Sequence, residues 1–286
     1  MIQRLKKWGV LTLIVCSPTF SSANDLTKAL AELLFQNECG GKQANLVYWS
    51  KNEPFPSLGI GHFIWLPKSQ QSLPFEETFP QLMQFLQHKS NKIPQTKIPQ
   101  TKIPESPVPP AWLVTLNPFE PPWANRTAFL AQQTSPQVTA LRTYLWQTRD
   151  GQAEFVVQHF QQHWQKVIQG LPESKRAQLQ SLLNTLMQTP KGQLMVLDYS
   201  NFKGFGYNAK EQYHHQGWGL IEVLSKMIDQ GSLNQTSPQA LQRQFIQAAK
   251  AVLLQRVANA PKLVNGESSE QHWLTGWFRR LDRLAK

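Results

Sequence analysis

Residues 35–66 read FQNECGGKQANLVYWSKNEPFPSLGIGHFIWL, which is typical of a helix end followed by short extended segments rich in turn residues. A series of leucines at helical spacing precedes this stretch: Leu26, Leu30, Leu33 and Leu34. Asp25 is a good N-cap for that helix, and Gly40 and Gly41 predict its end. Glu38 comes four residues after Leu34, so we expect its carboxylate on the core-facing stripe, near the negative end of the helix dipole. Such a carboxyl group should resist ionisation, which is what a general acid needs at neutral pH.

The downstream half of this stretch contains Ser57-Leu58-Gly59-Ile60-Gly61-His62, whose glycines let a backbone or a ligand approach closely. Together with Glu38, this run resembles the catalytic N-terminal segment of phage endolysin-type lysozymes. Those muramidases have a glutamate at the end of the first helix and a hydroxyl residue just before a Gly-Ile-Gly-His strand. The resemblance implies that Glu38 is the general acid and Ser57 the hydroxyl residue. It also implies that the strand lines the substrate through Gly59, Gly61 and His62.

The sequence departs from this family at the second catalytic carboxylate. The family has an aspartate shortly before the hydroxyl residue, and Lys51 stands at that position here. Glu53 is the nearest carboxylate, but the loop 49–54 has the composition of an exposed turn, so we expect Glu53→Gln to be nearly silent. Two routes remain open, which are hydrolysis with two carboxylates and lytic transglycosylation with a single acid/base.

A second glycine-rich block follows far downstream and contains Tyr213 and the run Gly217-Trp218-Gly219-Leu220-Ile221-Glu222. The run resembles the substrate-cleft helix of plant-type chitinases and the Gly-Leu-x-Gln helix of lytic transglycosylases, two families of the lysozyme-like superfamily. Glu222 stands where those families usually have glutamine. Glycines leave room for a glycan chain, and Tyr213 and Trp218 offer flat faces to sugar rings. The resemblance implies that Tyr213, Trp218 and Glu222 line a sugar groove.

The first 23 residues have the parts of a secretory signal peptide, namely a basic segment, an apolar run and a small-residue cleavage site ending at Ala23. The apolar run is too short to span a membrane. Cleavage after Ala23 predicts a periplasmic or secreted protein in which Cys39 is the only cysteine. Lipid attachment at Cys16 is an alternative, although Val15 before it is bulkier than such signals usually have.

The net charge is +11, and three of the positive charges lie in the predicted signal peptide. For an exported protein, peptidoglycan or a related polysaccharide and an anionic envelope surface are the expected partners, and nucleic acid is not. The alternative is that the charge only maintains solubility. We expect no cofactor.

Residues 24–286 are predicted to form one lysozyme-like domain with a proline-rich insertion at about 67–125. The insertion contains a Lys-Ile-Pro-Gln-Thr repeat, beginning at Lys92, Lys97 and Lys102, that cannot form a helix or a central strand. It is either a tolerant surface loop or a peptide-recognition arm. From Arg126 onward, apolar residues at helical spacing predict a mostly helical body, with a break at Asp150-Gly151. Strands are expected only near residues 44–65, so the predicted class is a helix-dominated α+β fold with a small β-hairpin lobe.

The segment 269–284 is predicted to be an amphipathic, basic helix. Its Gly276-Trp277-Phe278-Arg279-Arg280 run resembles the Gly-x-x-x-Arg-Arg helix near the end of phage-type lysozymes. Docking through its aromatic residues is the main expectation, and membrane-surface binding is the alternative.

Three histidines and one cysteine are further candidates for metal binding or nucleophilic chemistry. His214 and His215, taken with His62, do not form a metal-ligand spacing, so no metal site is predicted. Cys39 is either a thiol nucleophile or a small packing residue. The leading prediction is an exported enzyme that cleaves peptidoglycan glycan strands, as a muramidase or a lytic transglycosylase, with a single glutamate general acid, Glu38. The alternative is an inactive lysozyme-like scaffold that binds the cell wall.

Overall fold

The computed structural model describes residues 23–73, 75–92, 107–206 and 211–285. The protein is a mostly helical α+β protein with small antiparallel sheets, as the sequence predicted. The predicted signal peptide up to residue 22, and the repeat from Ile93 onward, lie outside the described residues. Within the described part of the chain, no helix is long and apolar enough to cross a membrane.

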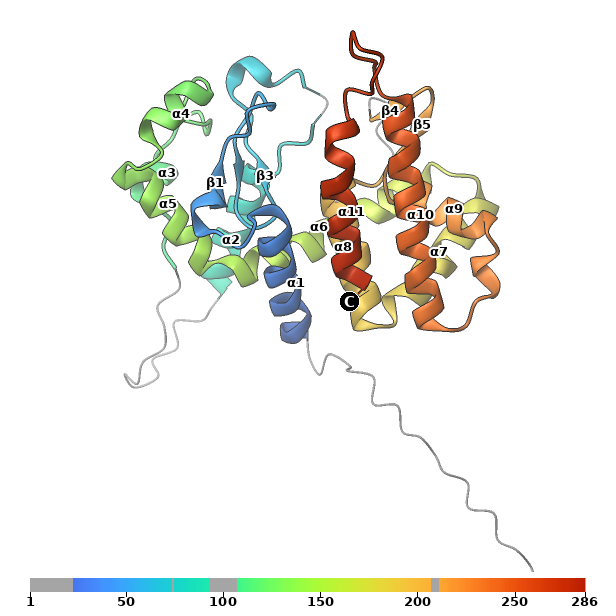
Figure 1. The fold of residues 1–286 in the computed structure, drawn as a ribbon. Coiled ribbons are helices and arrows are strands. Elements are labelled where there is room, and N and C mark those ends of the chain that lie inside the picture. The colour runs from blue at the N-terminus through green and yellow to red at the C-terminus, as the bar shows by residue number, and fades with distance from the viewer. Residues whose placement is uncertain (1–22, 74, 93–106, 207–210, 286) are drawn as a thin grey trace, which may run out of the picture.

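The elements form two lobes, with helix α6 running between them (Figure 1). The first lobe contains α1 (Ala23–Glu38), β1 (Val47–Tyr48), β2 (Ser57–Leu58), β3 (Phe63–Ile64), α2 (Phe79–Lys92), α3 (Ala111–Val114), α4 (Arg126–Gln132) and α5 (Pro136–Gln147). The second lobe follows α6 (Arg149–Gln169) and contains α7 (Glu173–Met187), α8 (Pro190–Lys203), β4 (Gln212–Tyr213), β5 (Gln216–Gly217), α9 (Leu220–Asp229), α10 (Pro238–Asn259) and α11 (Leu274–Ala285). Helix α1 packs against both α6 and α8, so it joins the two lobes.

Helix α1 ends where the sequence predicted and begins earlier than expected. Gly40 and Gly41 have φ angles of 60° and 70°, a left-handed conformation that glycine adopts easily, and the Gly41 amide donates to the Phe35 carbonyl at 3.2 Å. The prediction that Asp25 is the N-cap was wrong, because the helix already includes Ala23 and Asp25 lies in its first turn.

The expected hairpin is a three-stranded antiparallel sheet in the order β1-β2-β3, with Val47 opposite Leu58 and Ser57 opposite Ile64. The prediction of a Gly-Ile-Gly-His strand was wrong. Residues 59–62 form the turn between β2 and β3, in which Gly59 and His62 have φ angles of 72° and 49°. The alternating glycines therefore allow a tight turn and are not part of an extended strand.

A buried amide fixes this turn to the helices beneath it. Gln152 on α6 is fully buried, and its Oε1 accepts a hydrogen bond from the Ile60 amide at 2.9 Å. Its Nε2 donates to the Leu145 carbonyl at 2.6 Å and to Thr148 Oγ1 at 3.0 Å. A Cβ atom on Gly59 would lie 2.3 Å from the Gln152 oxygen, so only glycine permits this approach.

The predicted helical breaks differ from the observed ones at two places. The break expected at Asp150-Gly151 lies at Thr148, between α5 and α6, and Gly151 is inside α6. A Cβ atom on Gly151 would lie 2.8 Å from Leu86, so this glycine allows α2 to pack closely on α6. The segment expected to be helical from residue 217 begins instead with strand β5, and α9 starts at Leu220.

The described parts of the proline-rich insertion belong to the core. Trp65 and Trp123 are buried and have ring centroids 6.3 Å apart, and Phe79 and Phe119 pack against Trp65 at 4.9 and 5.2 Å. The flanks of the repeat are therefore anchored by aromatic packing that stabilises the first lobe.

We predict that Gln152→Leu lowers the free energy of unfolding by about 2–4 kcal/mol. The substitution keeps the side-chain volume and leaves the buried Ile60 amide and Leu145 carbonyl without partners. Urea unfolding measures the change. Gln158→Leu, at an exposed position of the same helix, is the control and should change stability by less than about 0.5 kcal/mol. Equal effects of the two substitutions would contradict the role of Gln152.

Candidate active site

A cleft of about 780 Å³ lies where the two lobes meet, and residues of both lobes line it. The first lobe contributes four predicted site residues to the lining: Glu38, Glu53, Ser57 and His62. The second lobe contributes Trp218, which was predicted to bind substrate, and Trp277, which was not. Gly61 also lines the cleft. The structure thus brings together residues that lie far apart in the sequence.

Glu38 lies at the end of α1, with its side chain 14% exposed, and contacts three polar side chains. Its Oε1 accepts hydrogen bonds from Arg280 Nη1 at 2.7 Å and from Asn201 Nδ2 at 3.3 Å. Its Oε2 lies 3.7 Å from His62 Nδ1. Glu38 lies beside a cleft, as expected. Its carboxyl group is surrounded by charged and polar side chains, whereas the sequence predicted an apolar environment.

Arg280, on α11, connects Glu38 to a second carboxylate. Its side chain is 7% exposed, and its Nε and Nη2 atoms donate to the two oxygens of Asp198 at 2.9 and 2.7 Å. Burial alone would lower the pKa of the Arg280 guanidinium, but the charges of Asp198 and Glu38 raise it above its ordinary value. Arg280 is therefore a permanent cation held between two carboxylates. Arg280 ends the Gly276-Trp277-Phe278-Arg279-Arg280 run, which has one residue fewer before the arginine pair than the Gly-x-x-x-Arg-Arg pattern that it resembles. Its contact with Glu38 was not predicted.

His62 and Ser57 lie beside Glu38 on the sheet side of the cleft. The His62 ring stacks on Tyr48 with centroids 6.1 Å apart, and its Nε2 atom has no hydrogen-bond partner among the described residues. Burial lowers the pKa of His62, and the charge of Glu38 opposes this shift in part. Ser57 is 5% exposed on the central strand β2 and presents the cleft with a hydroxyl group from a fixed backbone.

Glu53 lies on the same cleft as Glu38. The residue is exposed, yet desolvation within the cleft raises the pKa of its carboxyl group, and the charge of Glu38 raises it further. The indole nitrogen of Trp49 donates to the Glu53 carbonyl at 2.9 Å and fixes this loop. The sequence predicted an ordinary solvated glutamate, whereas Glu53 lines the same cleft as Glu38.

The wall from the second lobe combines aromatic rings with cations. The guanidinium of Arg256 lies 3.9 Å from the centroid of Trp218 and donates to both oxygens of Glu270 at 2.7 Å. Tyr213 donates to Glu270 at 3.1 Å and packs on Trp218, but it is not among the lining residues. Tyr213 therefore supports the wall from behind.

Lys203 is a cleft residue that the sequence did not reveal. Its Nζ atom lies 3.6 Å from the ring centroid of Trp277 and 4.0 Å from that of Phe202. Burial, followed by the charge of Arg256, lowers the pKa of Lys203 well below its ordinary value. The wall therefore offers ring faces with a weakly basic amine between them.

Three predicted substrate-binding residues do not line the cleft, namely Gly59, Tyr213 and Glu222. Glu222 packs in the first turn of α9 against Gly206 and Gly217, where added Cβ atoms would lie 2.1 and 2.5 Å from its carboxyl oxygens. Burial raises the pKa of Glu222, while backbone amides, including that of Gly219, oppose the shift. The glycines of this block make room for the Glu222 carboxyl group, and Gly59 makes room for Gln152 in the same way.

Cys39 is a packing residue. It is fully buried, and its Sγ lies 3.6 Å from the Gly59 carbonyl. Burial, with a further effect of the Glu38 charge, raises the pKa of the Cys39 thiol to about 12. A thiol that stays protonated is a poor nucleophile, so the alternative reading of Cys39 is disfavoured.

Glu76, His159 and His163 form a cluster with the composition of a metal-ligand set, and Glu76 and His159 line another part of the cleft. Burial would raise the pKa of Glu76, but the neighbouring side chains of His159, Gln81 and His163 lower it to about 2. The four-residue spacing of the two histidines on a predicted helix was the signal available in the sequence. His214 and His215, the histidine pair singled out in the sequence, are not part of this cluster. They are exposed turn residues with φ angles of 50° and 61°.

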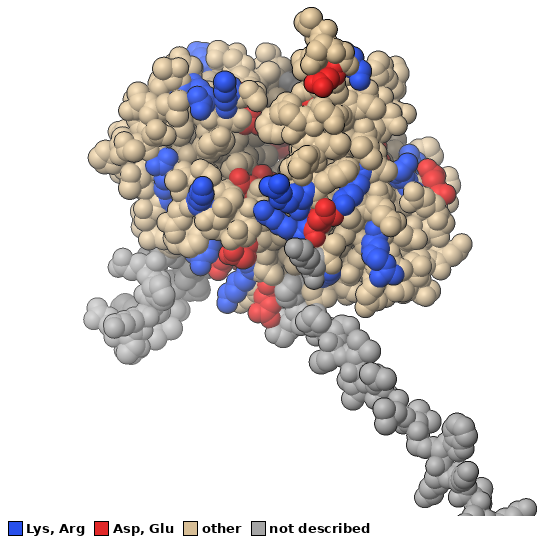
Figure 2. All heavy atoms as spheres, viewed as in Figure 1, with Lys and Arg blue, Asp and Glu red and all other residues tan. Residues whose placement is uncertain are grey.

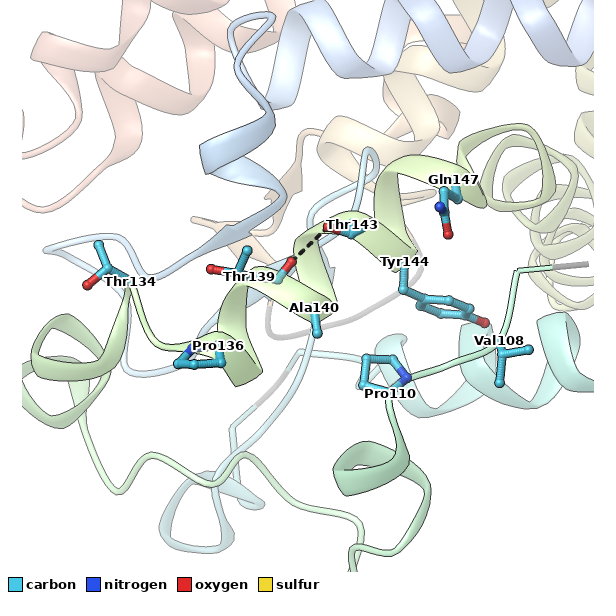
Figure 3. Close-up of a pocket in the computed structure, with 9 residues that line it drawn as sticks. All are labelled: Val108, Pro110, Thr134, Pro136, Thr139, Ala140, Thr143, Tyr144 and Gln147. Atoms are coloured by element: carbon cyan, nitrogen blue, oxygen red, sulfur yellow. Dashed lines mark hydrogen bonds between the residues drawn. The ribbon is translucent and has the colours of Figure 1, made fainter.

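A second hollow of about 600 Å³ lies on the outer side of α5 in the first lobe (Figure 3). Threonine, proline and alanine side chains make up most of its lining, and Tyr144 is the lining residue with an ionisable group. Burial raises the pKa of the Tyr144 hydroxyl to about 12, so it does not titrate near neutral pH. This hollow lacks the charged groups of the cleft between the lobes.

Comparisons with protein-family models, curated proteins and solved structures found no match for this chain.

We predict that Arg280→Met lowers the free energy of unfolding by about 3–5 kcal/mol, because the 1% exposed Asp198 loses its bidentate partner inside the protein. Urea unfolding measures the loss. Adding Asp198→Asn should restore part of it, and Arg279→Met, at the exposed neighbouring position, should change stability by less than about 0.5 kcal/mol. A similar small effect of Arg280→Met would show that the buried ion pair is not important for stability.

Proposed function

We propose that the protein is an exported enzyme that cleaves the glycan strands of peptidoglycan, with Glu38 as the carboxyl group at the scissile bond. The observation that carries the proposal is the position of Glu38, at a helix end on a cleft that also contains Ser57, His62 and Glu53. The resemblance of residues 35–66 to phage endolysin-type lysozymes supports the same assignment. The fold is then a lysozyme-like one, with the small sheet on one side of the glycan and α8–α11 on the other.

The walls of the cleft suit a polysaccharide. A volume of about 780 Å³ falls within the usual range of ligand sites. Trp218, Trp273 and Trp277 line it, and Trp273, 42% exposed, offers a ring face for a sugar, while Lys203 and Asn201 offer hydrogen-bond donors. Exposed cations, including Arg279 and Arg283, lie on α11, where Figure 2 shows Lys and Arg side chains over this face. They suit an anionic wall polymer or envelope surface as partner.

The different surroundings of Glu38 and Glu53 suggest how they share the chemistry. Glycosidases use one carboxyl group that holds a proton for the leaving oxygen and one carboxylate that stabilises the oxocarbenium-like transition state or directs water. Glu38 is ion-paired with Arg280, whereas the pKa of Glu53 is raised. We assign the second catalytic carboxyl group to Glu53, whose raised pKa favours it as the group that holds the proton before substrate binds. Glu38, ion-paired with Arg280, is then the ionised carboxylate that stabilises the transition state or directs water.

A second candidate function is glycan binding without cleavage. It is favoured by the Arg280–Glu38 ion pair, which engages the expected general acid, and by Lys51 at the position of the family's aspartate. The products released from purified peptidoglycan separate the candidates. Reducing ends indicate hydrolysis, anhydro-sugar ends indicate transglycosylation, and binding without release indicates the scaffold.

We predict that Glu38→Gln lowers the rate of peptidoglycan cleavage by about 100-fold or more, since the amide keeps the shape but removes the negative charge needed at the oxocarbenium-like transition state. Release of soluble fragments from purified cell walls measures the rate. Glu32→Gln, at an exposed position of the same helix, is the matched control and should leave the rate unchanged. Undiminished cleavage by the Glu38 variant would reject the proposed site.

We predict that Glu53→Gln also lowers cleavage by on the order of 100-fold and changes its pH profile. The pKa of Glu53 is raised, so its protonated fraction falls as the pH rises through that value, and the rate should fall along the same limb. The residual activity of the variant should lack this limb. A nearly silent substitution, together with anhydro-sugar products, would instead assign the reaction to Glu38 alone.

A further inference from the structure

The cluster of Glu76, His159 and His163 is built from two separate elements. The two histidines lie four residues apart on α6, so their side chains share one face of the helix. Glu76 approaches from the segment before α2, with its oxygens 3.3 Å from His159 Nε2 and 3.2 Å from His163 Nε2. The ligand atoms of the cluster all lie within 4.8 Å of one another.

The hydrogen bond at Nδ1 of His163 determines whether its Nε2 atom, which faces Glu76, carries a proton. Nδ1 lies 2.9 Å from the His159 carbonyl, which only accepts hydrogen bonds, so Nδ1 must carry a proton. In the neutral ring, Nε2 then has a lone pair and no proton, and it faces a carboxylate oxygen of Glu76, which is also an acceptor. Two acceptors at 3.2 Å need a positive charge between them, supplied either by a second proton on the ring or by a metal ion.

Several features favour a metal ion over an extra proton. The imidazole rings of His159 and His163 stack with centroids 3.8 Å apart, a contact that two imidazolium ions would oppose. A tetrahedral ion with ligand bonds of about 2.0–2.1 Å separates neighbouring ligand atoms by about 3.3 Å. Each histidine Nε2 has a Glu76 oxygen close to that separation, Oε2 for His159 and Oε1 for His163. A ring N–H donated to a backbone carbonyl is the usual support of a metal-binding histidine, and Gln81 steadies Glu76 by donating to its Oε1 at 3.0 Å.

We propose that Glu76, His159 and His163 bind a divalent transition-metal ion, with Zn²⁺ as the expected occupant. Two imidazoles and one carboxylate are a ligand set that suits Zn²⁺ and related ions. Glu76 and His159 line the cleft between the lobes, so the remaining coordination positions face it. The ion is then able to hold water or an anionic oxygen of whatever occupies the cleft. This site is independent of the proposed glycan cleavage, since Glu38 is not one of its ligands.

Isothermal titration of the chelator-treated protein with Zn²⁺ at a pH of about 8, where an ordinary histidine is neutral, tests the proposal directly. We expect one ion per chain and an affinity that falls at least about 100-fold in His163→Gln and in Glu76→Gln. The double substitution His214→Gln/His215→Gln removes an exposed histidine pair of the other lobe and should leave the affinity unchanged.

Circular dichroism of each variant verifies that the fold persists, and Glu76→Gln, at a side chain 37% exposed, is the variant least able to disturb packing. A second measurement uses Co²⁺ in place of Zn²⁺, where intense visible absorption reports nitrogen and oxygen ligands in a four-coordinate site. No Zn²⁺ binding by the unaltered protein would overturn the proposal. Equal affinity of the unaltered protein and the Glu76 and His163 variants would overturn it as well.

Discussion

The buried guanidinium of Arg280 is the interaction on which the arrangement of the cleft depends. It connects Glu38 at the end of α1 with Asp198 on α8, and it lies on α11, so three helices from different parts of the chain meet at one cation. A charge in this position is stable only while both carboxylates remain, because burial of an unpaired ion costs several kcal/mol. The orientation of Glu38 toward the cleft follows from this pairing, as does the closure of the second lobe against the first.

Much of the fold could be predicted because helices are encoded locally. Apolar periodicity indicated most helices after Arg126, and Gly40-Gly41 indicated the end of α1, since both signals act over a few residues. The errors arose where one pattern suits two structures. The run 59–62 fits a glycine-rich strand and a tight turn equally well, and the turn is decided by Gln152, which contacts it from far along the chain. The burial of Trp65 and Trp123 likewise depends on long-range packing that periodicity does not record.

The candidate site was predictable only in part, for the same reason. Glu38, Ser57 and His62 lie within one short motif, so the sequence itself places them together. Arg280 and Glu76 reach the cleft from distant segments, and a single sequence does not show which distant residues pair. The second glycine-rich block shows the opposite error, in which a local motif indicated that Glu222 lines the groove, although it does not. The glycines around Glu222 are needed because its carboxyl group occupies the space that side chains would fill.

The sequence separation of Glu38 and Arg280, 242 residues, has a consequence for biosynthesis. While the chain is being made, the ribosome releases both carboxylates of this network long before it releases the guanidinium that neutralises them. Helices α1 and α8 therefore emerge carrying negative charges that repel one another across their future contact. Arg280 on α11 supplies the positive charge that pairs with both carboxylates, so the network is complete only once the last helix has docked.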